Sequence, residues 1–81
     1  MKEINLNIPG YHYNSNVTSK NNSLYYDSND SEDDWIEVVF FTNDSNNVAV
    51  NYVVNGEVEK VCLFPINDAL EQRITFWITH K

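Results

Sequence analysis

Apolar and polar residues alternate along several segments of the chain, and this period of two predicts a mainly β protein. In residues 2–8, isoleucine and leucine alternate with polar residues, which predicts a half-buried strand ended by Pro9. Residues 11–23 are polar and rich in asparagine and serine, so they form either a long connection or a frayed edge strand. A short apolar group at 24–26 then precedes an acidic stretch.

The centre of the chain has the strongest strand pattern. Residues 35–42 are apolar on both alternating faces and are interrupted only by Glu37, which is typical of a central strand covered on both sides. A polar loop at 43–47 reverses the chain, and the β-branched run 48–54 follows. The dipeptide Asn55-Gly56 then predicts a tight hairpin turn, because both residues adopt positive φ at low cost.

A two-residue turn at this position fixes the register of the hairpin. It pairs Val54 with Glu57 and, farther from the turn, Tyr52 with Glu59. Both faces of the hairpin become more apolar away from the turn. We therefore expect the hairpin base in the core and its tip in water.

The C-terminal part predicts a short helix and then a last strand. Asp68 stands three residues before Glu71, which resembles a capping box and predicts a helical turn near residues 67–73. Residues 73–79 alternate again, which predicts a strand with isoleucine and phenylalanine facing inward. The whole chain, 1–81, is thus expected to be one domain, an antiparallel sheet or small β-sandwich of five to six strands.

Charge changes this picture of a plain β domain. The 81 residues hold 12 Asp and Glu against five Lys and Arg, a net charge of −7. This balance argues against nucleic acid or an anionic membrane as a direct partner, since binding polyphosphates requires cationic side chains. No apolar run has the length of a membrane span, the first residues lack the apolar stretch of a signal peptide, and a single cysteine excludes an internal disulfide. We therefore expect a cytoplasmic protein.

The excess of negative charge comes from one part of the chain, residues 21–44. The other residues hold equal numbers of acids and bases, whereas this window has no Lys or Arg. Its acids are Asp27, Asp30, Glu32, Asp33, Asp34, Glu37 and Asp44. Such a run is either a solvated loop or an electrostatic docking surface.

Enzymatic chemistry has little support. An EF-hand over 27–38 would place Glu32 at the turn glycine and Val38 at the bidentate glutamate, so that pattern fails. The acidic run is too polar to bury a catalytic carboxylate. Cys62 lies in an apolar strand, the two histidines lie near the chain ends, and two glycines are too few for a phosphate loop. We expect no catalytic residue, no metal site and no cofactor.

Aromatic side chains accompany the acids, and interfaces between proteins concentrate Tyr and Trp. Trp35 directly follows the acidic run, and Trp77 lies among Thr and Arg on the predicted outward face of the last strand. A second layer of structure covering Trp77 is the simpler alternative for that residue. The predicted partner-binding residues are Tyr25, Tyr26, Asp27, Asp30, Glu32, Asp33, Asp34, Trp35, Glu37 and Trp77.

Small size, acidity, no signal sequence and no catalytic set together resemble the physical character of bacterial immunity proteins, including those of contact-dependent growth inhibition. This resemblance covers the whole chain and involves no motif. It implies a small inhibitor that binds a basic, nuclease-type toxin at its active site. Two alternatives are a phage-encoded DNA mimic that inhibits a host nuclease and a structural or accessory subunit whose acidic loop maintains solubility.

Overall fold

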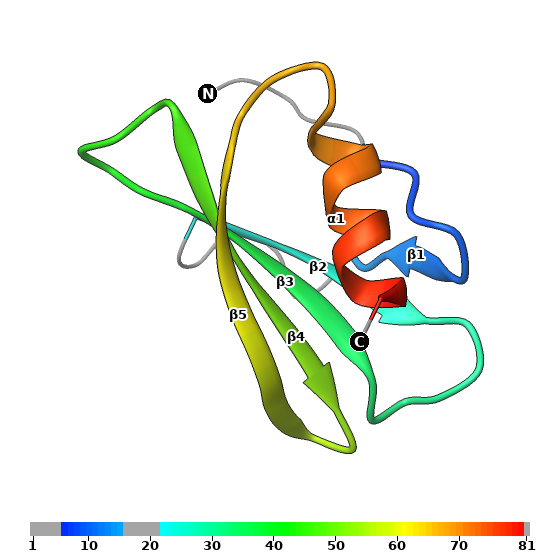
Figure 1. Ribbon diagram of the computed structural model, residues 1–81. Coiled ribbons are helices and arrows are strands. Elements are labelled where there is room, and N and C mark those ends of the chain that lie inside the picture. Colours follow the sequence, from blue (N-terminus) through cyan, green and yellow to red (C-terminus); the bar gives the residue numbers. More distant parts are fainter. Residues whose placement is uncertain (1–5, 16–21, 81) are drawn as a thin grey trace.

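The structure, a computed structural model, describes residues 6–15 and 22–80 (Figure 1). Its elements are β1 (Tyr11–Tyr13), β2 (Ser23–Ser28), β3 (Trp35–Phe40), β4 (Asn47–Val54), β5 (Glu57–Pro65) and α1 (Leu70–Thr79). The five strands form a single antiparallel sheet in chain order, with β1 and β5 at its edges. The predicted mainly β, antiparallel class is confirmed, and its form is one open sheet with a helix rather than a sandwich.

The core lies between α1 and one face of the sheet, which we call the covered face. Ile36 and Val38 of β3, like Val48 and Val50 of β4, are fully buried there against α1. These four side chains alternate with residues of the opposite, uncovered face, over which no helix or strand of the described residues lies. β3 is central, as predicted, but the expectation that it is covered on both sides is wrong, because α1, the one helix of the described residues, packs on only one face of the sheet.

The N-terminal strand predicted for residues 2–8 falls partly outside the described residues. Of that segment, Leu6–Ile8 is described and is not part of a strand. Ile8 nevertheless points into the core at 1% exposure, and Asn7 is exposed, as the alternation predicts. The segment is held by α1, because the backbone N–H of Asn7 donates to Oε1 of Glu71.

The strand predicted over 73–79 is wrong, since these residues continue the helix α1. Leu70, Ile74 and Ile78 are its buried residues, and their spacing of four places them on one helical face. A strand would also bury Phe76, which is 62% exposed. The sequence pattern was ambiguous because positions 74 and 78, four residues apart, share one face both in a strand, with its period of two, and in a helix, with its period of 3.6.

The capping box predicted from Asp68 and Glu71 does not form. Ala69 is the N-cap residue and makes no side-chain cap bond. The amide oxygen of Asn67 accepts the N–H of Ala69 at 2.8 Å, so the turn before α1 is ordered by asparagine rather than aspartate. Glu71 instead binds Asn7, which joins the helix to the N-terminal segment.

The turn of the β4–β5 hairpin forms as predicted, but the register changes two residues farther along. Asn55 and Gly56 have φ of 55° and 78°, and the first pairs match the prediction. A bulge then shifts the ladder between Tyr52 and Val53, so Tyr52 pairs with Lys60 instead of Glu59. The Asn55-Gly56 dipeptide alone predicts the turn, whereas a bulge depends on the packing of both strands.

This one-residue shift exchanges the faces of β5. Cys62 and Phe64 turn toward the covered face and pack on the core. Val61 and Leu63 turn outward and are 60% and 63% exposed. On the uncovered face, β5 therefore presents exposed apolar side chains. The predicted register would have placed Val61 and Leu63 on the covered face.

Candidate functional site

One end of the sheet gathers six of the eleven acidic residues that the structure describes. The β2–β3 loop lies against the β4–β5 turn, because the N–H of Gly56 donates to the carbonyl oxygen of Asp33 at 2.8 Å. The N–H of Asn55 donates to Oδ1 of Asp34 at 2.9 Å. We call this surface the acidic end, and it consists of Asp27, Asp30, Glu32, Asp33, Asp34 and Glu57.

The β2–β3 loop has a defined conformation despite its polar sequence. Oγ of Ser28 accepts the N–H of Asp30 at 3.1 Å, and Oγ of Ser31 accepts the N–H of Asp33 at 3.2 Å. Ser28 also donates its N–H to the carbonyl oxygen of Asp34 at 3.0 Å. Ser28 and Ser31 therefore form two successive side-chain turns, which order the backbone that carries the carboxylates.

A hollow of about 450 Å³ opens within this loop. Its lining residues are His12, Asp27, Ser28, Asn29, Asp30, Ser31 and Glu32. Oδ2 of Asp27 accepts a hydrogen bond from Nδ2 of Asn14 at 2.7 Å, and Nδ1 of His12 lies 2.6 Å from Oδ1 of Asn29. No lysine or arginine of the described residues forms an ion pair with these carboxylates. Three carboxylates in one hollow, with no described cation paired to them, present a negative surface that suits a basic side chain.

Three predicted residues, Tyr25, Trp35 and Glu37, lie on the uncovered face, next to the acidic end. Trp35 is half-buried and pairs across the sheet with Asp27 on one side and Val53 on the other. Two pairs farther along, on the same face, the hydroxyl of Tyr25 donates to Oε2 of Glu37 at 2.7 Å. This hydrogen bond to a carboxylate raises the pKa of Tyr25 above its usual value.

Tyr26 was predicted to bind a partner and does not lie on the surface. It is 2% exposed in the core of the covered face, where its ring lies 5.6 Å from that of Tyr13. Burial raises its pKa. Alternation along β2 explains the difference, because Tyr25 and Tyr26 necessarily point to opposite faces.

Trp77 is also separated from the acidic end. It lies on α1, half-buried over the core, with its ring 5.5 Å from Phe64 and 6.3 Å from Tyr52 in edge-on geometry. Of the two interpretations of Trp77, the structure agrees better with the one in which another layer covers it, and that layer is the sheet. Asp44, part of the acidic window of the sequence, lies in the β3–β4 loop at the other end of the sheet.

Sequence reasoning missed Glu57, which the fold adds to the acidic end. The signal was available, because loops of an up-and-down antiparallel sheet alternate between its two ends. In that order the β2–β3 loop and the β4–β5 turn share one end. Glu57, the first residue of β5, is exposed there beside Gly56.

Metal-binding clusters and membrane-spanning helices are absent from the described part of the chain. In residues 6–15 and 22–80, no three His, Cys, Asp or Glu side chains gather in a way that could hold a metal ion. Cys62 packs on the core, and no described helix is long and apolar enough to cross a bilayer. Comparisons with protein-family models, curated proteins and solved structures give no match.

Proposed function

We propose that this protein is a small inhibitor that binds a basic protein through its acidic end, as an immunity protein binds a nuclease-type toxin. The observation that supports the proposal most is the ordered hollow lined by Asp27, Asp30 and Glu32. Glu57 from a second element extends this negative surface. An arginine or lysine of the partner enters the hollow and forms hydrogen bonds to more than one carboxylate.

A nuclease fits this surface because it must hold phosphates in a cationic cleft. An acidic end that fills the cleft excludes the nucleic acid substrate by occupying the same cationic side chains. Charge complementarity also accelerates encounter, toward about 10⁸–10⁹ M⁻¹s⁻¹ at low salt. Fast capture is useful to an inhibitor that has to block a toxin before it cleaves its substrate.

Apolar contacts beside the acids complete the docking surface. Trp35 lies next to Asp27 on the uncovered face, and Val58, 57% exposed, follows Glu57 along β5. Specific protein interfaces bury about 800 Å² on each partner, more than the hollow alone provides. The proposed surface therefore runs from the acidic end onto the adjoining part of the uncovered face.

The test compares two variants with the same change in net charge. The test variant Asp30→Asn/Glu32→Gln removes two carboxylates from the hollow, and the control Asp44→Asn/Asp68→Asn removes two from the opposite end of the sheet. Immobilised wild-type protein selects binders from a displayed library of nuclease toxin domains. Stopped-flow mixing then measures association from about 20 to about 200 mM NaCl.

We expect the test variant to associate about three- to tenfold more slowly at low salt, with a flatter salt dependence, while the control behaves like wild type. Inhibition of nuclease cleavage should follow the same order. Equal kinetics for both variants would refute docking through the acidic end. Selection of no domain from this library would refute the target class, and a test variant that only aggregates would favour a solubility role.

A further inference from the structure

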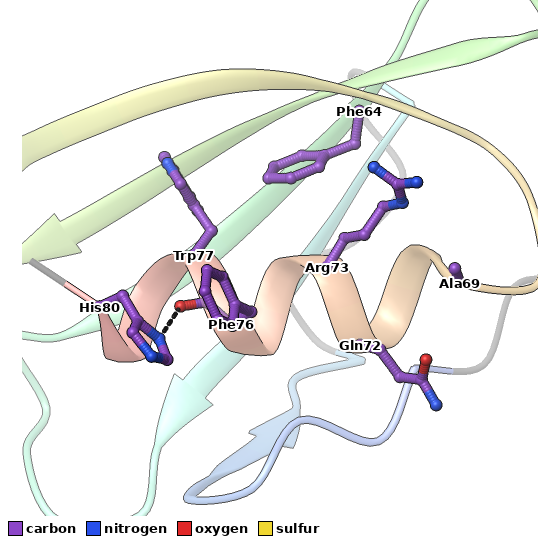
Figure 2. Close-up of a pocket in the computed structure, with 7 residues that line it drawn as sticks. All are labelled: Phe64, Ala69, Gln72, Arg73, Phe76, Trp77 and His80. Carbon is purple, nitrogen blue, oxygen red and sulfur yellow. Dashed lines mark hydrogen bonds between the residues drawn. The ribbon is translucent and has the colours of Figure 1, made fainter.

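A second surface, which shares no lining residue with the hollow of the acidic end, lies between α1 and β5 (Figure 2). It is a groove of about 550 Å³. The groove is lined by Phe64, Ala69, Gln72, Arg73, Phe76, Trp77 and His80. Arg73 and Trp77 extend from the helix toward the strand, and Phe64 extends from β5 toward the helix. Its base is therefore aromatic, and its rim carries one guanidinium group.

The walls of this groove are held in place by specific contacts. Nζ of Lys60, on β5, donates to the carbonyl oxygen of Trp77 and, at 3.2 Å, to that of His80. The rings of Phe76 and His80 stack with centroids 3.7 Å apart, and Nδ1 of His80 lies 2.8 Å from the carbonyl oxygen of Phe76. The helix end is thus fixed to the strand, so a ligand meets a preformed groove.

The strand that borders the groove has a free edge. β5 pairs with β4 on one side only, and no other strand of the described residues pairs with it. The register shift near Val58 and the proline at position 65 limit regular pairing to 61–64. Over this short stretch, backbone groups that point away from β4 are available to an added strand.

Charge distinguishes this groove from the rest of the molecule. Arg73 is exposed and forms no ion pair with any described carboxylate. None of the residues lining the groove is acidic, whereas the protein as a whole has a net charge of −7. An anionic segment is therefore repelled by the acidic end and attracted here.

We propose that an extended, acidic segment of a partner protein adds beside residues 61–64 of β5 as a further strand. An apolar side chain of the segment enters the groove between Phe64 and Trp77, and a carboxylate pairs with Arg73. Backbone hydrogen bonds supply affinity in this mode of recognition, and the groove selects alternate side chains. The proposal does not depend on the function proposed for the acidic end.

The experiment begins with a displayed library of random peptides of about eight residues, selected on the full-length protein. We expect peptides with large apolar residues at alternate positions and an Asp or Glu beside them. Arg73→Glu should weaken binding of a selected peptide about tenfold or more, and changing the peptide's acid to Lys should restore it. The control Ser45→Glu, in the β3–β4 loop, should leave the affinity unchanged.

Strand addition itself is tested on the peptide, so the fold of the protein is not disturbed. Alternate N–H groups of an added strand point toward β5 and away from it. N-methylation of the amides that point toward β5 should therefore abolish binding, and N-methylation of the others should not. Amide exchange at residues 61–64 should slow in the complex. Selection of no peptide, indifference to Arg73→Glu, or N-methylation without a periodic effect would overturn the proposal. So would a dimer in sedimentation whose β5 amides are already protected, because a second copy would then occupy the edge.

Discussion

Replacement of Lys60 by methionine tests whether this side chain fixes α1 to the sheet. Lys60 donates to the carbonyl oxygens of Trp77 and His80, at the helix end where backbone carbonyls lack partners. Its Nζ also lies 4.9 Å from the centroid of the Trp77 ring. Methionine keeps most of the apolar stem and removes the charge and all the donors.

The expected loss follows from these contacts. Two charge-assisted hydrogen bonds at a half-buried site contribute about 1 kcal/mol each, and the cation–π contact adds about 0.5 kcal/mol. The total of about 2.5 kcal/mol corresponds to a Tm lower by about 10–20 °C for a domain of this size.

Urea unfolding, followed by tryptophan fluorescence and by circular dichroism, measures this loss. The matched control Lys60→Arg retains the charge and the donors and should retain most of the stability. A change below about 0.5 kcal/mol in Lys60→Met would refute the reasoning, because surface charges with no structural role have effects of that size.

Two further predictions concern the helix face and one carboxylate. Ile74→Ala should lower the free energy of unfolding by about 3 kcal/mol and Phe76→Ala by less than about 1 kcal/mol in urea titrations, since only Ile74 is fully buried; a strand at this place would give similar losses. Hydrogen bonds from Asn47 and Asn46 lower the pKa of Asp44 below its usual 3.8, so Asp44 stabilises the fold above that pH and the effect disappears as the pH falls through the lowered pKa. Urea midpoints of wild type and Asp44→Asn should therefore converge as the pH falls below about 4, and a constant difference would exclude this linkage.

The sequence predicted the centre of the fold because two independent signals agreed there. The apolar run of β3 and the Asn55-Gly56 turn each specify local geometry, and together they define consecutive antiparallel strands. The sequence predicted a helical turn near residues 67–73 but not its continuation to Thr79, because the β-branched and aromatic residues of 73–79 favour strands locally. Burial of Leu70, Ile74 and Ile78 against the sheet overrides that preference.

The candidate site was predicted in part, for reasons that differ between residues. Charge counting located Asp30 and Glu32 correctly on one loop, since neighbours in sequence remain neighbours in a tight turn. It also grouped Asp44 with them, although a strand of six residues separates the two loops and places them at opposite ends. The hollow itself depends on contacts of Asn29 with Gly10, just before β1, and with His12 of β1, which no local pattern reveals.

Glu37 extends the negative charge of the acidic end onto the uncovered face. Its carboxylate accepts hydrogen bonds from the hydroxyl of Tyr25 at 2.7 Å and from Nδ2 of Asn51 at 3.0 Å. These neutral donors hold the charge in the middle of the face, between one apolar row that includes Val39 and another that includes Trp35. An apolar sheet stacked on this face would desolvate the carboxylate without a counter-charge, at a cost of several kcal/mol. A partner that covers the face therefore has to bring a cation to Glu37, and the basic partner proposed for the acidic end meets this requirement.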